Sequence, residues 1–153
     1  MNARIMTEVR TLFSMIASVS MVLIACSTLH AEALENGLKK WDPYLIQGRI
    51  MQVGEGYCVV AEEWIMVLDT KRGGKDIRTR IFDDRGNPVS VAELSKGKYI
   101  LAKGGQAWDE KLKTSVLLAT EIYIVNKPVD LNDEGQRRRF GGEPRPWGDA
   151  RER

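Results

Sequence analysis

The stretch Thr-Ser-Val-Leu-Leu-Ala-Thr-Glu-Ile-Tyr-Ile-Val, residues 114–125, decides the fold class. It contains neither glycine nor proline and is rich in β-branched, aliphatic and aromatic residues, which is the composition of a β-strand. Glycine-containing and charged segments upstream of it separate shorter runs of similar composition. The sequence therefore predicts an all-β domain in which 114–125 is the last and longest strand.

Four earlier runs have the composition of strands. They are residues 48–53, 57–68, 77–82 and 98–103. Turn signals separate them at 54–56, 71–75 and 83–88, and Gly104-Gly105 is expected to open a hairpin loop before the last strand. The run 57–68 is interrupted by Glu62-Glu63, so it is either one bent strand or two.

A short helix is expected between the third and fourth strands. Ser90-Val91-Ala92-Glu93 matches a capping box, in which the Ser90 hydroxyl accepts from first-turn amides and Glu93 reaches back to the Ser90 amide. Gly97 is placed to end this turn. Three strands, a short helix and two strands is the order of the five-stranded Greek-key OB barrel, with a plain antiparallel barrel or sandwich as the alternative.

Four short patterns at turn and core positions carry a family resemblance. They are Gly48-x-Ile50, Thr79-x-Ile81-x-Asp83-x-x-Gly86, Leu94-x-x-Gly97-x-x-Ile100 and Ala119-x-x-Ile122. Through them the chain resembles a class of uncharacterised bacterial exported OB-like domains. The resemblance spans about half of the chain and implies a fold, but no catalytic role.

The N-terminus has the pattern of an export leader. Arg4 and Arg10 precede residues 11–31, which contain no Asp, Glu, Lys or Arg. A positive start followed by an apolar segment is what the secretory translocon recognises, and a retained membrane anchor is the alternative. Leu23-Ile24-Ala25-Cys26 resembles the lipobox of bacterial lipoproteins, in which the cysteine is acylated and becomes the mature N-terminus.

A second cleavage site competes with the lipobox. Ala31 and Ala33 are the small residues that ordinary signal peptidase accepts, and cleavage there would release a soluble protein. With cleavage before Cys26, four segments are expected: a signal peptide at 1–25, a lipid anchor and tether at 26–43, the barrel at 44–125 and a disordered Arg-rich tail at 126–153. The expected location is the periplasmic side of the envelope, as an outer-membrane lipoprotein, with a soluble periplasmic protein as the alternative.

Composition excludes several classes of function. The 153 residues carry 23 Lys+Arg against 21 Asp+Glu, which is too balanced for a general nucleic-acid binder. Two cysteines and one histidine are too few for a disulfide scaffold, a Cys/His metal site or a histidine-based catalytic centre. We therefore expect no cofactor, no metal, no nucleic-acid partner and no catalytic residues, and we expect Cys58 to be a buried strand residue.

Two features are candidates for ligand contact. One is Trp108, in the expected loop before the last strand, where an indole is suited to stacking on a ligand or to closing the barrel as a lid. The other is a basic cluster suited to an anionic lipid headgroup or glycan, or else simply a solvated hairpin tip. Its members are Lys71, Arg72, Lys75, Arg78 and Arg80.

The tail supplies a third candidate surface. Its arginines and aromatic residues are suited to contacts with a partner protein in the envelope. The residues are Arg137, Arg138, Arg139, Phe140 and Trp147. The function expected from the sequence is thus a small envelope lipoprotein, attached to a membrane through Cys26, that acts as a non-catalytic binding or assembly module. The alternative is a soluble periplasmic domain that binds a small anionic ligand or a glycan.

Overall fold

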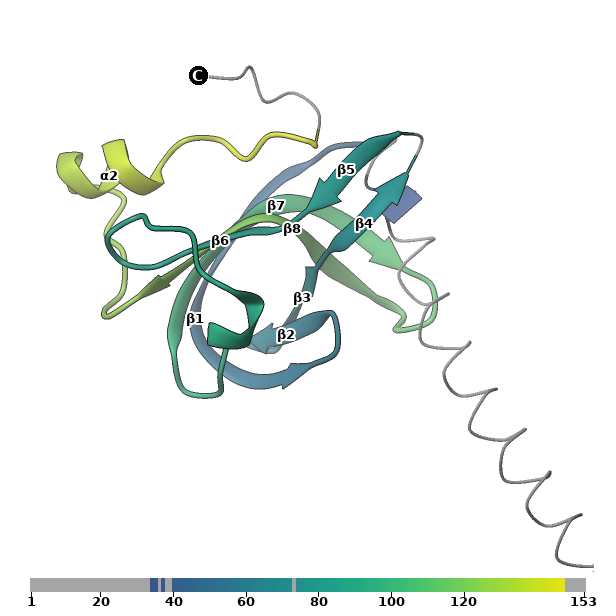
Figure 1. Cartoon of the computed structure of the whole chain (residues 1–153), viewed down its shortest axis with the longest axis horizontal. Helices are drawn as coiled ribbons and strands as arrows, with labels where there is room; N and C mark the ends of the chain where they lie inside the picture. Colours follow the sequence, from purple (N-terminus) through teal and green to yellow (C-terminus); the bar gives the residue numbers. More distant parts are fainter. Residues whose placement is uncertain (1–33, 36, 38–39, 73, 148–153) are drawn as a thin grey trace, which may run out of the picture.

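The computed structural model of the chain describes residues 34–35, 37, 40–72 and 74–147 (Figure 1). The leader, Cys26 and both expected cleavage sites lie outside the described residues. Almost all regular structure is β-strand. The strands are β1 (Pro43–Gly54), β2 (Tyr57–Val60), β3 (Glu63–Val67), β4 (Asp69–Arg72), β5 (Lys75–Arg78), β6 (Arg80–Phe82), β7 (Tyr99–Asp109) and β8 (Thr114–Val125).

Five of these strands close into a barrel. β1 pairs with β2 and β7, β2 pairs with β3, and β7 pairs with β8, all antiparallel. The barrel closes where β3 and β8 run parallel, with Trp64 opposite Val116 and Val67 opposite Ala119. The predicted five-stranded β-barrel is confirmed, and its last strand has the predicted bounds.

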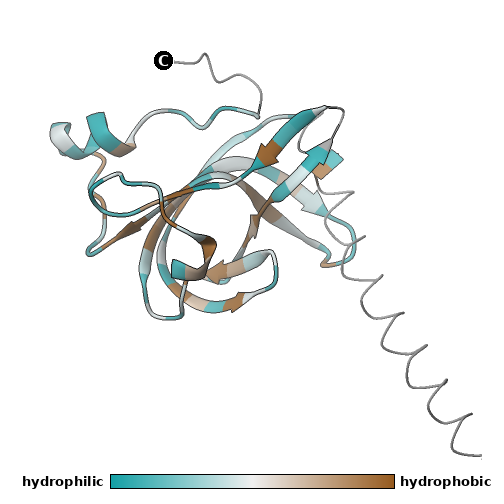
Figure 2. Ribbon diagram, in the orientation of Figure 1, coloured by the Kyte–Doolittle hydropathy of each residue, from teal (hydrophilic) through white to brown (hydrophobic). Residues whose placement is uncertain are grey.

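The buried apolar residues form three clusters, one of them inside the barrel. Figure 2 shows apolar segments, in brown, along the strands of the barrel. Cys58, Ile65, Leu117 and Ile122 belong to the interior cluster and are fully buried. Their strand neighbours point the other way, so Met66 and Leu118 pack in a second cluster with Ile77 of the β4–β5 ribbon and with Leu34, which precedes β1. Cys58 is a buried strand residue, as predicted.

The run 77–82 divides between the two clusters. Ile77 lies in β5 and the outer cluster, whereas Ile81 lies in β6 and the interior cluster. Thr79 is the junction, because its hydroxyl donates to the Ala119 carbonyl at 2.6 Å and accepts from the Leu68 amide at 2.8 Å. The predicted third strand is therefore two short strands, β5 and β6, and β6 pairs parallel with β8.

The helix expected between the third and fourth strands is only a 3₁₀ turn, Val91–Glu93. The Ser90 hydroxyl accepts from the Ala92 amide at 3.3 Å, but the Glu93 carboxylate binds the Lys98 ammonium at 3.0 Å. Half of the predicted capping box is thus present. A longer helix, α2 (Glu134–Phe140), lies instead in the C-terminal segment.

Gly104 and Gly105 do not form the predicted loop but lie inside β7. A side chain at Gly104 would place its Cβ 2.0 Å from the Leu118 carbonyl oxygen, and one at Gly105 would lie 2.6 Å from the Trp41 ring. The pairing of β7 with β8 also shifts register between Lys103 and Gly104, as at a bulge. These glycines therefore allow close approach, and the turn comes later, at 110–113.

The C-terminal segment was predicted to be disordered, yet up to Trp147 it packs on the barrel. Val129 and Phe140 are buried against Leu101 and Val125. Trp147 meets Trp41 edge to face, with ring centroids 5.7 Å apart. Isolated apolar residues in a polar sequence gave no periodic signal, but each of these finds an apolar site on the outer face of the barrel.

Candidate functional site

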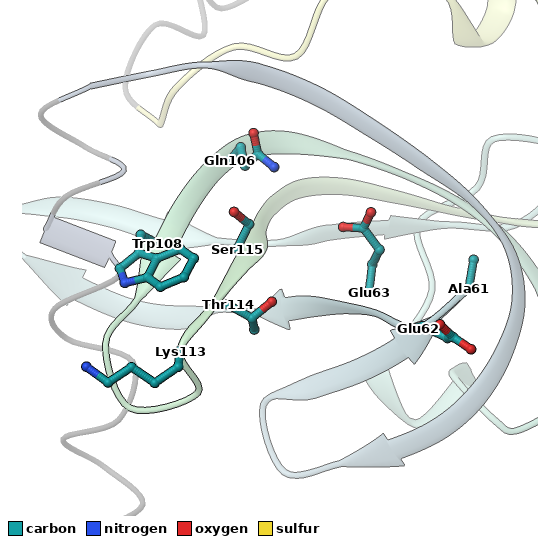
Figure 3. A pocket seen from close by; sticks show the side chains of 8 residues that line it. All are labelled: Ala61, Glu62, Glu63, Gln106, Trp108, Lys113, Thr114 and Ser115. Atoms are coloured by element: carbon teal, nitrogen blue, oxygen red, sulfur yellow. The ribbon is translucent and has the colours of Figure 1, made fainter.

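An open hollow of about 420 Å³ lies at one end of the barrel, where the β2–β3 turn and the β7–β8 loop come together (Figure 3). This volume is within the range of small-molecule sites. We call it the Trp108 hollow. It is lined by Ala61, Glu62, Glu63, Gln106, Trp108, Lys113, Thr114 and Ser115.

Trp108 is the penultimate residue of strand β7 rather than part of a loop, and it lies directly opposite Ser115 of β8. Its side chain is 46% exposed, although indoles are usually well buried. Figure 3 shows Trp108, Gln106 and Ser115 on one side of the hollow and Glu63 on the other. The indole is therefore part of the wall of a recess and is available to a ligand.

A hydrogen bond from β1 holds the Glu63 carboxylate in place. Its Oε1 accepts a hydrogen bond of 3.3 Å from the hydroxyl of Tyr44 on β1. The negative charge of Glu63, followed by burial and by this hydrogen bond, raises the pKa of Tyr44, so the phenol remains a neutral donor. A carboxylate held in this way can accept hydrogen bonds from a ligand in the hollow.

Backbone strain is concentrated at the same place. In the described part of the chain, three non-glycine residues have positive φ: Ala61 at 50°, Glu62 at 68° and Lys113 at 54°. All three line the Trp108 hollow. Left-handed conformations cost L-residues roughly 1–2 kcal/mol each and cluster at functional sites. Glycine and asparagine, the residues that such turns prefer, are absent from all three positions.

Glu62 and Lys113, the other two ionisable residues of the hollow, differ in whether they have a partner. Glu62 is exposed and makes no hydrogen bond or ion pair with any described residue. Lys113, in contrast, places its Nζ 2.7 Å from Oε2 of Glu110. The hydrogen bond from Lys113, more than its charge, lowers the pKa of Glu110. The Lys113 ammonium is thus paired with Glu110, whereas no cation among the described residues neutralises the Glu62 carboxylate.

The basic cluster lies elsewhere, on the β4–β5 ribbon and β6. None of its residues with a described side chain lines the Trp108 hollow. Arg78 is paired with Asp69 at 2.9 Å, and Lys71 lies across the ribbon from Asp76. Arg72 lies opposite Lys75 in the backbone pairing. The two predicted candidates for ligand contact, Trp108 and the basic cluster, therefore lie at different places on the protein.

Arg80 belongs to a partly buried ionic group beneath the C-terminal segment. It pairs with Glu121, whose other oxygen is 3.7 Å from the Nζ of Lys103. Lys103 is 4% exposed and donates to the carbonyl of Gly142 at 2.9 Å. Burial lowers the pKa of Lys103. Through Lys103, this group is connected to the C-terminal segment.

The predicted tail contacts separate into two kinds. Arg137, Arg138 and Arg139 lie on α2 and are exposed, and Arg138 pairs with Glu134 one turn earlier. Phe140 is buried, and the indole N–H of Trp147 donates to the Arg78 carbonyl at 3.2 Å. The arginines remain accessible to a partner, whereas the two aromatic residues fix the segment to the barrel.

Burial raises the pKa of the Cys58 thiol to about 12. In the described part of the chain, no cluster of three His, Cys, Asp or Glu side chains could hold a metal ion. Among the same residues, no helix is long and apolar enough to cross a membrane.

The sequence indicated Trp108 but not the residues that surround it. Glu63, Ser115 and Gln106 come from three strands, and only the parallel β3–β8 pairing brings the first two together. Tyr57 and Trp64 do not join Trp108, because their rings pack against each other with centroids 4.8 Å apart in the outer cluster. The doublet Glu62-Glu63, which interrupts a strand with two acids, is the sequence feature that could have indicated this site, but it was interpreted only as a break in the strand.

No protein-family model matches the chain, and the curated proteins give no significant match.

Proposed function

We propose that this protein is a non-catalytic binding module of the bacterial cell envelope, held at a membrane surface by an acylated Cys26, that takes its ligand into the Trp108 hollow. The observation that carries the binding role is the half-exposed Trp108 indole in a recess with Glu63 and Ser115. An exposed aromatic face can stack on a ligand ring, and the polar side chains beside it can form hydrogen bonds with the ligand.

The strand order supports an OB-like assignment. β1, β2 and β3 are neighbours, and β8 closes the barrel between β3 and β7. OB barrels bind ligands over the second and third strands and the loop between the last two. The turn between β2 and β3 and the loop between β7 and β8 are the parts that form the hollow here.

The envelope location is supported by the leader alone. Arg4, Arg10 and the Leu23-Ile24-Ala25-Cys26 lipobox are its features. Each buried acyl methylene contributes roughly 0.8 kcal/mol to membrane binding, so more than one chain gives a stable anchor. Residues 27–43 would then connect the lipid to the barrel.

The binding role is tested by a thermal-shift panel of envelope glycan fragments. We expect at least one fragment to raise the melting temperature of the wild-type protein, and Trp108→Ala to abolish this response. Val91→Ala is the matched control, because Val91 is 57% exposed and lies outside the hollow. An equal response of the Trp108→Ala variant would contradict the proposal.

The anchor is tested by the intact mass of the mature protein from fractionated cells, beside a Cys26→Ser variant. A diacylglycerol-modified chain that begins at Cys26, and is lost in the variant, is the expected result. An unmodified chain beginning at Glu32 or Leu34 would instead give the soluble periplasmic form, with the same binding hollow.

A further inference from the structure

The charges around the Trp108 hollow indicate which ligands it accepts. The ionisable residues in its wall are Glu62, Glu63 and Lys113. Lys113 is bound by Glu110 at 2.7 Å, which lies beside the hollow and offsets its charge. The recess is therefore negative, and an anionic ligand would be repelled from it.

Neither acid in the wall has a cation as its partner among the described residues. Glu63 accepts from the neutral hydroxyl of Tyr44, and this leaves its charge in place. Glu62 is exposed and unpaired within the described part of the chain. Two carboxylates thus retain their capacity to bind a ligand that brings its own positive charge.

The third element is the indole of Trp108. An aromatic face attracts a cation within about 6 Å of the ring centre, and tryptophan does so best. Its face also packs against the apolar face of a ring-shaped ligand. The combination of an exposed indole, carboxylates and the polar Gln106, Thr114 and Ser115 fits a ligand with hydroxyl groups as well as a charged amine.

We propose that the Trp108 hollow binds a ring ligand carrying a protonated amine, of the amino-sugar class. This deepens the proposed function and rests on it. It also reverses the charge expected from the sequence, because the basic cluster that would attract an anion is not part of the hollow.

The test compares three probes that share one pyranose ring and differ in charge: glucosamine, glucose and glucuronate. Binding to the mature protein is measured by titration at mildly acidic pH and low salt, where the amine is protonated. We expect glucosamine to bind more tightly than glucose, and glucuronate most weakly. Glucosamine binding should weaken with salt, since exposed charge pairs are screened.

Isosteric variants connect this order to the two carboxylates. Glu63→Gln and Glu62→Gln should each weaken glucosamine binding roughly threefold, as for exposed charge pairs, and should weaken glucosamine binding more than glucose binding. Glu55→Gln is the control, because Glu55 is an exposed acid in the turn at the opposite end of β2. Circular dichroism melts verify that each variant is folded.

The outcomes separate this inference from the proposed function. Equal affinities for glucosamine and glucose, or unchanged glucosamine binding in Glu63→Gln and Glu62→Gln, would overturn the charge preference. If Trp108→Ala still abolished binding in that case, the hollow would remain the binding site. Absence of glucosamine binding, or glucosamine binding that persists in Trp108→Ala, would overturn the amino-sugar assignment. The thermal-shift panel of glycan fragments would then decide separately whether the hollow binds another ligand.

Discussion

Gln47 and Val129, 82 residues apart in the chain, are joined by two hydrogen bonds. The Val129 amide donates to Gln47 Oε1 at 3.0 Å, and Gln47 Nε2 donates to the Val129 carbonyl at 3.2 Å. A side-chain amide thus pairs with the backbone as a neighbouring strand would. This contact on β1 begins the path of the C-terminal segment over the outer face of the barrel.

Phe140→Ala should release this segment without unfolding the barrel. Phe140 is 5% exposed and packs against Leu101, Val125 and the Tyr123 ring. Its truncation should cost about 2 kcal/mol or more of docking free energy. Hydrogen exchange of residues 126–147 should accelerate while the amides of β7 and β8 remain protected. Arg138→Ala, which removes only an exposed ion pair, should change neither. Equal loss of protection in the barrel would contradict this account.

Gly104→Ala should be severely destabilising. The added Cβ would lie 2.0 Å from the Leu118 carbonyl oxygen, and backbone on both strands would have to move. We expect a loss of about 3 kcal/mol or more of unfolding free energy, measured by urea denaturation. Gly142→Ala is the matched control, because a Cβ there meets nothing within 4 Å. A Gly104→Ala protein as stable as the wild type would show that β7 and β8 lie farther apart.

Ala61→Gly should stabilise the protein. Ala61 has a φ of 50°, a left-handed conformation that is strained for alanine but not for glycine. We expect a gain of about 0.5–1 kcal/mol in unfolding free energy. Ala92→Gly, in the exposed 3₁₀ turn, should lower the unfolding free energy, because glycine at this position relieves no strain and increases the conformational entropy of the unfolded chain. Destabilisation by Ala61→Gly would remove the argument that strain is stored at the hollow.

Cys58 should make stability fall at alkaline pH. Burial raises the pKa of its thiol from 9.0 to about 12. The unfolded chain therefore loses this proton first, so the stability present below pH 9.0 is lost as the pH rises toward about 12. Cys58→Ala lowers stability at neutral pH by creating a cavity but should show a flatter decline over this range in denaturant titrations. Parallel pH profiles of the two proteins would contradict the prediction.

The parts of the fold that depend on local pattern could be predicted. Residues 114–125 form β8 with the predicted bounds, and the strand order gave the barrel. Gly104 could not be assigned from sequence alone, since glycine marks both turns and close backbone contacts and only the position of Leu118 distinguishes them. The packed C-terminal segment was missed for a related reason, because Phe140 finds its apolar site only after the barrel has formed.

The site was predictable only in part. Trp108 was identified as a contact residue, but its placement near Glu63 depends on the parallel β3–β8 pairing, which no local pattern encodes. The basic cluster was predicted to contact an anionic ligand because its residues are close together in the chain. In the structure, acids such as Asp69 and Glu121 bind two of its arginines.

Chemical-shift mapping by NMR tests the central claim most directly. The mature protein would be titrated with the glycan fragment that gives the largest thermal shift. We predict that the shifted amides cluster at the two segments that form the hollow, around Glu63 and Trp108. Shifts that instead cluster on the β4–β5 ribbon or on α2, with the hollow unaffected, would contradict the assignment of this recess as the binding site.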